Sequence, residues 1–363
     1  MKKMLKNKRN YGKKGVSLLL CLLLVLSMAA CSPKQTNTDD GNQNGQISDV
    51  NTADTSSQEI VLTDQAGREV KLDAPAEKIV SCYYITTYAC LALGLRDNLV
   101  GIESKADKRP IYGMAAPELL ELPAVGTLKE FNVEAAAALE PDLVIMPKKL
   151  LDSADALTEL GIPVLVVYPE NQVLLEEMLS LIGKACGAEE KAEELIDYYG
   201  NAQKELAAYA KETDVKVYMA GVSSYLNTAP EGMYQADLIQ KAGGVNAAKN
   251  LTGDYWTEVS YEDILAMNPD VMIVPSSAEY SVDDIKNDPQ LSEVNAVKNG
   301  AVYQMPKGIE EWDSPIPSGV LGIRWLCSIL HEDSYSMDAM KEDAKDFYKT
   351  FYLFELDESL ITK

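Results

Sequence analysis

The chain contains the stretch Val133–Pro147, VEAAAALEPDLVIMP, and repeats its pattern at Tyr261–Pro275, YEDILAMNPDVMIVP. Glu, Ala, Pro, Asp, Ile and Pro recur in register between the two copies. Each copy predicts a short helix that stops before its first proline, because proline disfavours α geometry in the residue ahead of it. The apolar run that follows is typical of a parallel strand covered on both faces. Two copies in register therefore predict two similar lobes.

The composition is that of a globular protein with room for two domains. The 363 residues are 47% apolar and 25% charged, and the net charge is −23. Met1–Ala30 holds seven Lys or Arg and no acid, so the charge without it is −30. Such an acidic body is expected to avoid nucleic acid and anionic lipid, which bind through Lys and Arg. The simpler interpretation of the acidity is a well-solvated surface.

The amino terminus has the features of an export signal. Seven basic residues precede the apolar run Val16–Ala30, which is shorter than the roughly 20 residues of a membrane-spanning helix. Cys31 follows Ala29-Ala30 directly, an arrangement that resembles a bacterial lipoprotein signal, in which the thiol carries a diacylglycerol. The alternative is an ordinary secreted protein. We expect residues 1–30 to be the signal peptide and 31–58, which are polar and aperiodic, to be an acylated, disordered tether.

The remaining chain predicts an α/β fold with two Rossmann-like lobes. Strands alternate with helical stretches, a pattern that favours mostly parallel sheets covered by helices. We assign residues 59–186 to an N-terminal lobe, 187–213 to a connecting helix and 214–363 to a C-terminal lobe. The helical pattern of Ala188–Lys211 would span about 36 Å, enough to join two lobes. The alternative is a surface helix within one domain.

Cysteine and histidine usage argues against a metal site or a cofactor. The cysteines beyond Cys31 contain no CxxC pair, and we expect buried thiols rather than a disulfide or metal ligands. They are Cys82, Cys90, Cys186 and Cys327. His331 is the single histidine, whereas protein sites for zinc or manganese use several histidines with carboxylates. A bis-histidine haem site is impossible for the same reason, whereas haem ligated by a tyrosine remains open.

Candidate ligand-binding residues come from the ends of the predicted strands, because ligands of open α/β sheets bind beyond the carboxyl ends of the strands. The candidates are Tyr83, Tyr84, Lys148, Tyr168, Tyr225, Tyr255, Trp256 and Trp312. Aromatic walls with a few cations suit a large, ring-bearing ligand with anionic or hydroxamate edges. The alternatives are packing roles for the tyrosines and solvent exposure for Lys148. Trp325, at helical spacing, is expected in the core.

Four stretches together resemble the class III substrate-binding proteins of ABC importers, which deliver ferric siderophores, haem and cobalamin. They are VLTDQAGREVKLDAPAEKIVS, FNVEAAAALEPDLVI, VSYEDILAMNPDVMIV and SPIPSGVLGIRWLCSILHED. The resemblance implies two α/β lobes joined by one rigid helix, with the ligand in the cleft between them. It also implies a monomer, lipid-anchored on the extracytoplasmic face of the membrane, that serves an ABC permease and its ATPase. The ligand expected first is a ferric siderophore, then a corrinoid such as cobalamin, then haem.

The family resemblance also assigns a docking role to two acids. Glu134 and Glu262 match positions that pair with permease arginines, one on each lobe. The alternative is that each is a first-turn helix acid, which the helix dipole favours. A chelatase-like enzyme is less expected, because the chain lacks a GxSxG, P-loop or zinc motif and these two acids are predicted on different lobes.

Overall fold

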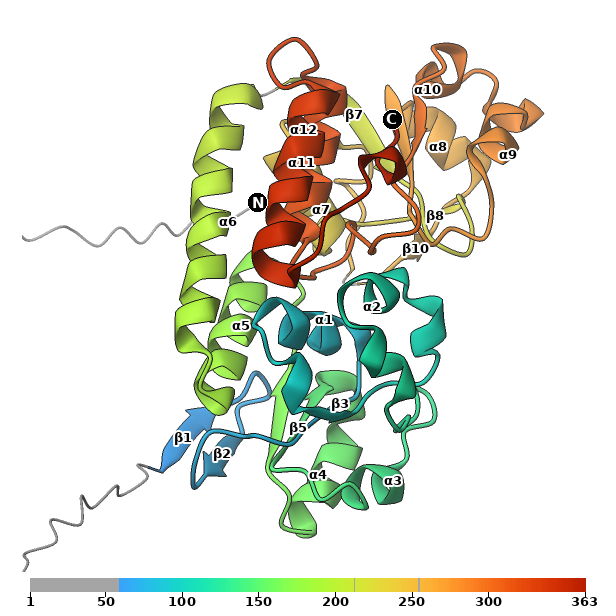
Figure 1. Ribbon diagram of the computed structural model, residues 1–363. Helices are drawn as coiled ribbons and strands as arrows, with labels where there is room; N and C mark the ends of the chain where they lie inside the picture. The colour runs from blue at the N-terminus through green and yellow to red at the C-terminus, as the bar shows by residue number, and fades with distance from the viewer. Residues whose placement is uncertain (1–58, 212, 254) are drawn as a thin grey trace, which may run out of the picture. The chain divides into compact units, whose positions relative to one another are not determined.

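The computed structural model describes residues 59–211, 213–253 and 255–363 (Figure 1). The predicted signal peptide, Cys31 and the tether lie outside the described residues. Within the described part, the blue-to-green elements form a first lobe and the yellow-to-red elements a second lobe. Helix α6 runs beside both.

Each lobe is built on a four-stranded sheet in which every neighbouring pair is parallel. The first sheet has the order β4-β3-β5-β6, with β3 Ile79–Ser81, β4 Leu99–Gly101, β5 Leu143–Pro147 and β6 Val164–Val167. The second has the order β12-β11-β7-β9, with β7 Lys216–Met219, β9 Val245–Asn246, β11 Val271–Val274 and β12 Val302–Gln304. Reversed, the second order matches the first strand for strand. The predicted pair of similar parallel lobes is therefore confirmed.

Helices cover both sheets. Those of the first lobe are α1 Tyr84–Ala92, α2 Pro110–Ala115, α3 Val133–Ala137, α4 Leu151–Glu159 and α5 Gln172–Cys186. Those of the second are α7 Tyr234–Lys241, α8 Tyr261–Met267, α9 Val282–Lys286, α10 Asn295–Lys298, α11 Gly319–Leu330 and α12 Met337–Phe347. Two small antiparallel pairs complete the fold, β1 Ile60–Thr63 with β2 Glu69–Leu72 and β8 Asn227–Thr228 with β10 Thr257–Glu258. No helix in the described ranges is both long and apolar enough to cross a membrane.

Helix α6, Glu189–Tyr209, leads from the first lobe to the second. Its 21 residues span about 31 Å. It packs against α5 on the first-lobe side and against α7 and α11 on the second-lobe side. The Tyr199 hydroxyl also donates a hydrogen bond of 2.8 Å to the carbonyl of Pro317. The long helix expected between the repeats is present, with ends slightly inside the predicted ones.

The repeated Pro-Asp pair ties neighbouring strands together in both lobes. The Asp142 carboxylate accepts the backbone N–H groups of Glu77 (3.0 Å) and Lys78 (2.8 Å), just before β3. The Asp270 carboxylate accepts the N–H of Lys216, the first residue of β7, at 3.0 Å. Each aspartate also donates its own N–H to the carbonyl of Lys78 or Lys216 at 2.9 Å. The repeat therefore sets which strand lies beside β5 and β11.

The residue before the first proline of each repeat has a left-handed backbone. Glu140 has φ 47° and Asn268 has φ 43°. Left-handed geometry is costly for most side chains, and asparagine tolerates it better than glutamate. The Asn268 side chain is also used, since its Oδ1 accepts the N–H of Asn295 at 2.9 Å. The backbone at Glu140 in the first copy is therefore more strained than the backbone at Asn268 in the second copy.

The C-terminal segment encloses a buried acid. Glu310, 3% exposed, accepts hydrogen bonds from the hydroxyls of Tyr348 (2.7 Å) and Tyr352 (3.0 Å). The indole N–H of Trp312 donates to the Tyr348 hydroxyl at 2.8 Å. Burial raises the pKa of Glu310 to about 7, and burial likewise raises the pKa of the neighbouring Asp313 to about 7.

The left-handed position gives the first prediction. Glu140→Asn should raise the free energy of unfolding by about 1 kcal/mol, because asparagine adopts this backbone more readily. The reciprocal change, Asn268→Glu, should lower it by at least as much, since it also removes the Asn295 contact. Urea unfolding followed by circular dichroism measures both. If Glu140→Asn leaves both the free energy of unfolding and the m-value unchanged, the backbone at this position is not strained.

The buried acid gives the second prediction. The pKa of Glu310 is about 7 in the folded protein against an ordinary 4.5, so the native state keeps a proton that the unfolded chain has released. This contribution to stability is complete below about pH 4.5 and is lost as the pH rises to 7, by about 3 kcal/mol. In Glu310→Gln, the decrease in the free energy of unfolding between pH 4.5 and pH 7 should be smaller than in wild type by about 3 kcal/mol. The exposed Glu121→Gln is the control, and equal pH profiles for wild type and Glu310→Gln would contradict the assignment.

Candidate ligand-binding site

The carboxyl ends of the first sheet bring predicted residues together. Lys148 follows β5 and Tyr168 follows β6, its parallel neighbour. The Lys148 ammonium lies 4.9 Å from the centre of the Tyr168 ring, within cation–π range. Lys148 is exposed and the ring is half-buried. A cation held over an aromatic face at a sheet edge can receive an anionic, ring-bearing ligand, which is the chemistry that the sequence predicts there.

A row of tyrosines follows β3. Tyr83 and Tyr84 make an edge contact with centroids 4.7 Å apart, and the row continues through Tyr88 and Tyr112 at 5.5 and 5.7 Å. Tyr83 and Tyr84 are half-buried, whereas Tyr88 and Tyr112 are fully buried. Burial raises the pKa of Tyr84 to about 12, so its hydroxyl keeps its proton and can donate a hydrogen bond. The sequence identifies the first two members of this row and misses the two on its inner side.

The sequence also misses a cation at this row. Arg109 precedes α2 and places its guanidinium 4.1 Å above the Tyr84 ring. Its side chain is 26% exposed and forms an ion pair with Glu311 of the second lobe. Two further contacts cross between the lobes here, from the Tyr88 hydroxyl to Glu311 at 3.0 Å and a long one from the Tyr84 hydroxyl to Ser314 at 3.4 Å. No sequence motif marks Arg109, because its position depends on the loop between β4 and α2.

The environment of Arg109 is one in which a positive charge persists. Burial alone would lower its pKa, but Glu311 and the tyrosines Tyr88 and Tyr84 raise it above the ordinary value. A guanidinium that is partly shielded from water and held by an aromatic face is a strong donor to carboxylate or other oxyanion oxygens. This position can therefore anchor an anionic group between the lobes.

The structure places Trp312 differently from the prediction. The acids around it suggest an exposed loop, but the ring is 0% exposed and its N–H is bonded to Tyr348. A ring enclosed on all sides cannot stack on a ligand in this conformation, so the expected binding role is corrected to a core role. Trp325 is also 0% exposed, as predicted.

Among the described residues, the other predicted residues of the second lobe make no ring contact with the tyrosines of the first lobe. The Tyr225 hydroxyl donates to Asp288 at 2.9 Å, and its ring makes an edge contact with Tyr280. Tyr255 is 79% exposed. Trp256 is half-buried and packs against the main apolar core. Their part in binding stays a prediction.

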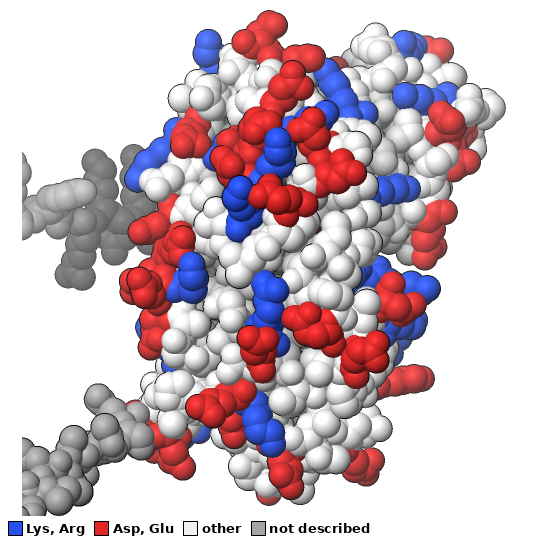
Figure 2. All heavy atoms as spheres, in the orientation of Figure 1, with Lys and Arg blue, Asp and Glu red and all other residues white. Residues whose placement is uncertain are grey.

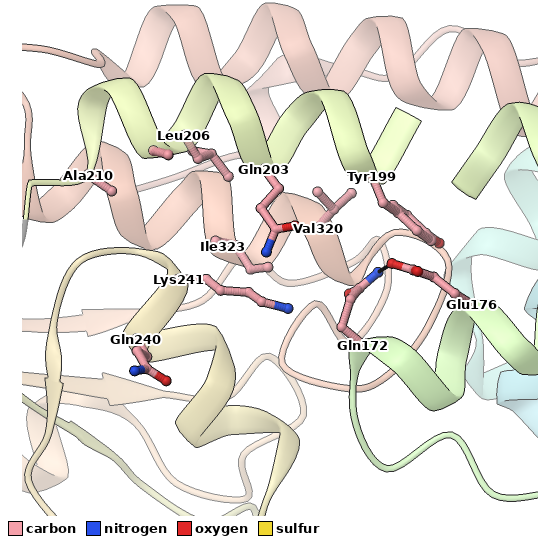
Figure 3. A pocket seen from close by; sticks show the side chains of 11 residues that line it. Gln172, Glu176, Tyr199, Gln203, Leu206, Ala210, Gln240, Lys241, Val320 and Ile323 are labelled. Atoms are coloured by element: carbon pink, nitrogen blue, oxygen red, sulfur yellow. Dashed lines mark hydrogen bonds between the residues drawn. The ribbon is translucent and has the colours of Figure 1, made fainter. Parts of the chain in front are cut away.

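A separate pocket of about 260 Å³ lies along α6 (Figure 3). Its walls come from α5, α6, α7 and α11, and Gln203 and Lys241 point into it. The residues that line it are Gln172, Glu176, Tyr199, Gln203, Leu206, Ala207, Ala210, Gln240, Lys241, Val320 and Ile323. None of the predicted binding residues is among them. Lys148, Tyr168, Tyr83, Tyr84 and Arg109 of the first lobe have the chemistry expected of the ligand site.

Glu134 and Glu262 occupy equivalent places in the two lobes. Both are exposed and lie in the first turn of their helices, α3 and α8, behind the caps Asn132 and Ser260. Figure 1 shows α3 and α8 in different lobes. The face of the molecule in Figure 2 carries many acidic side chains interspersed with basic ones, in keeping with the acidic composition. These two acids are therefore available to a partner, although their role remains a prediction.

The cysteines and the histidine have structural surroundings. Cys82, Cys90, Cys186 and Cys327 are buried free thiols, as predicted. His331 Nε2 lies 3.1 Å from the carbonyl oxygen of Ala242. Among the residues that the model describes, no group of three or more His, Cys, Asp or Glu side chains is arranged to hold a metal ion.

Comparison with known proteins places this arrangement in a family of solute receptors. The family model described as "Periplasmic binding protein" matches residues 79–308. The molybdate-binding protein MolA of Haemophilus influenzae is 26% identical, covering 80% of this chain and 90% of its own. Two Bacillus subtilis proteins also match. The substrate-binding lipoprotein YvrC is 26% identical, and the match covers 76% of this chain and 87% of YvrC. The Fe(3+)-citrate-binding protein YfmC is 24% identical, and the match covers 81% of this chain and 90% of YfmC.

The fold has solved counterparts. A periplasmic solute binding protein from Veillonella parvula is 29% identical, with a TM-score of 0.72, over 84% of this chain and 95% of that chain. The residues that the family model matches include both sheets and α6. The chain belongs to the periplasmic binding protein family and is a class III substrate-binding component of an ABC importer.

Proposed function

We propose that the cleft between the lobes captures an anionic iron chelate of the ferric siderophore type and delivers it to the permease. The observation that carries this proposal is Arg109, held over Tyr84 where the two lobes meet. Guanidinium donors bind carboxylate and other oxygen anions, and the half-buried rings of Tyr83 and Tyr84 offer apolar surface to the organic part of a chelate. Lys148 over Tyr168 supplies a second cation on the same sheet edge.

The named relatives support an oxygen-rich anion as the ligand. MolA is named for molybdate and YfmC for ferric citrate, and both ligands present negatively charged oxygens. Molybdate is much smaller than an iron chelate, whereas the half-buried rings of Tyr83 and Tyr84 offer apolar surface that a small oxyanion does not need. A corrinoid or haem, held by the same aromatic walls, is the alternative among larger ligands.

The proposed setting is the outer face of the cell membrane. Cys31 is proposed to carry the lipid that anchors the protein, with 32–58 as a tether that leaves the lobes free to reach the permease. The relative YvrC is named as a lipoprotein, which supports this setting. Glu134 and Glu262 are proposed to pair with arginines of the permease. Two acids on similar lobes present a matched pair to a two-fold partner.

The ligand proposal is tested by titrating the mature protein with a ferric trihydroxamate, ferric citrate, molybdate, cobalamin and haemin. Tryptophan fluorescence, corrected for ligand absorbance, reports binding through the half-buried Trp256. An iron chelate should quench saturably, and Arg109→Gln should weaken that binding by about ten-fold or more. Lys349→Gln, which removes an exposed cation paired with Glu355, is the matched control. Saturable binding of molybdate, cobalamin or haemin alone would replace the iron chelate as the ligand.

The docking proposal is tested by reversing both charges, in Glu134→Lys/Glu262→Lys. Transport should fall by more than about ten-fold, because like charges would face the permease arginines, while ligand affinity stays unchanged. Uptake of the labelled ligand by cells or proteoliposomes measures the first quantity, and fluorescence titration the second. Glu193→Lys/Asp338→Lys, at exposed sites on α6 and α12, changes the net charge equally. Loss of ligand affinity in the Glu134/Glu262 variant would place the acids in the ligand site instead.

A further inference from the structure

The two oxygens of the Glu311 carboxylate both receive donors from the opposite lobe. Oε1 pairs with the Arg109 guanidinium and Oε2 accepts the Tyr88 hydroxyl at 3.0 Å. The Glu311 side chain is 15% exposed and that of Arg109 is 26% exposed, so the pair is largely shielded from water. Because little solvent reaches this ion pair, it is screened less than an ion pair on the open surface.

Glu311 offers Arg109 the same chemical group that an anionic ligand would offer. One face of the guanidinium is covered by the Tyr84 ring at 4.1 Å, and the Nη1 donor is engaged by the carboxylate. A carboxylate oxygen of a ligand that uses this Nη1 donor would therefore have to take the place of Glu311. In a shielded site, the loss of one partner of a charge pair is unfavourable unless another charge replaces it, because the remaining charge would be left unpaired.

Glu311 is also surrounded by groups that make its release possible. Glu310 and Asp313 are acids on the same segment, and the negative charge of Glu311 contributes to the raised pKa of both. Burial keeps Glu310 and Asp313 protonated up to about pH 7, so like-charge repulsion acts on Glu311 only above that pH. The Arg109 guanidinium and the Tyr88 hydroxyl together hold Glu311 between the lobes.

We propose that Glu311 is a built-in competitor that occupies the anion position on Arg109 and links the two lobes while no ligand is bound, and that an anionic ligand displaces it. The inference rests on the proposed function, since it assigns Arg109 to the ligand anion. It makes Glu311 a specificity-determining residue. Ligands that carry an oxygen anion can break the contact, whereas neutral ligands gain nothing from Arg109. Affinity for anions is lowered by the fraction of molecules in which Glu311 occupies the site.

The test compares Glu311→Gln with wild type, using ferric citrate as the anionic probe and a neutral ferric trihydroxamate as the second probe. Glutamine keeps the size of the side chain and weakens the contact with Arg109. The affinity for ferric citrate should rise about five-fold or more, and that for the neutral chelate should stay the same. Glu293→Gln removes a charge from an exposed pair with Lys298 and should change neither affinity.

A double-mutant cycle separates competition from a general effect on the fold. Arg109→Gln should weaken binding of ferric citrate, and Glu311→Gln should give no further gain when Arg109 is already Gln. A gain that persists without Arg109 would overturn the proposal, as would an unchanged or lower affinity of Glu311→Gln for ferric citrate. An equal gain for the neutral chelate would overturn the competitor role as well.

A ligand-free measurement keeps this inference separable from the proposed function. Backbone amides of residues 104–112 and 308–314 should exchange hydrogen faster in Glu311→Gln than in wild type, because the contact between the lobes is weakened. Glu293→Gln should exchange as wild type does. If neither chelate binds the wild-type protein, the proposed ligand class fails while the exchange data still decide the link between the lobes. Unchanged exchange in Glu311→Gln would show that the link does not hold the lobes together.

Discussion

The arrangement of both lobes depends on an aspartate that reaches across to the neighbouring strand. Asp142 accepts two backbone N–H groups before β3, and Asp270 accepts the N–H that starts β7. Each carboxylate thereby aligns two parallel strands at their amino ends. Because the strands run parallel, their carboxyl ends are aligned as well, and the loops that follow lie along one edge. The residues that can meet a ligand are therefore positioned by a contact at the opposite edge of the sheet.

The charge on this edge is unusual for the protein as a whole. The chain is strongly acidic, with a net charge of −23, yet Arg109 and Lys148 both lie against tyrosine rings on the first lobe. An aromatic face holds a cation without neutralising it, although the charge of Arg109 is also matched by the Glu311 carboxylate. An acidic body around a few such cations repels anions at long range and attracts them only at the site. Binding then relies on close contacts more than on electrostatic steering.

The fold was predictable because its signals are local and repeated. A proline, an aspartate and an apolar run within Val133–Pro147 and Tyr261–Pro275 determine a helix end, a strand and its neighbour. The site was predictable only where a residue directly follows a strand, as with Lys148 and Tyr168. Trp312 was misassigned because its neighbouring acids indicate exposure, whereas the ring is enclosed by Tyr348, which lies in the C-terminal segment. Arg109 was missed because only the folded loop brings it over Tyr84.

The single helix between the lobes limits how the protein can adapt to different ligands. α6 packs along its length against helices of both lobes, so the distance between the two sheets cannot change greatly without breaking those contacts. Relatives that match most of this chain are named for molybdate and for ferric citrate, two ligands of different size. Differences in size must then be met by side chains at the strand ends. In this chain, the ion pair between Arg109 and Glu311 lies where the two lobes meet, and under the proposed mechanism an anionic ligand would enter by replacing the Glu311 carboxylate.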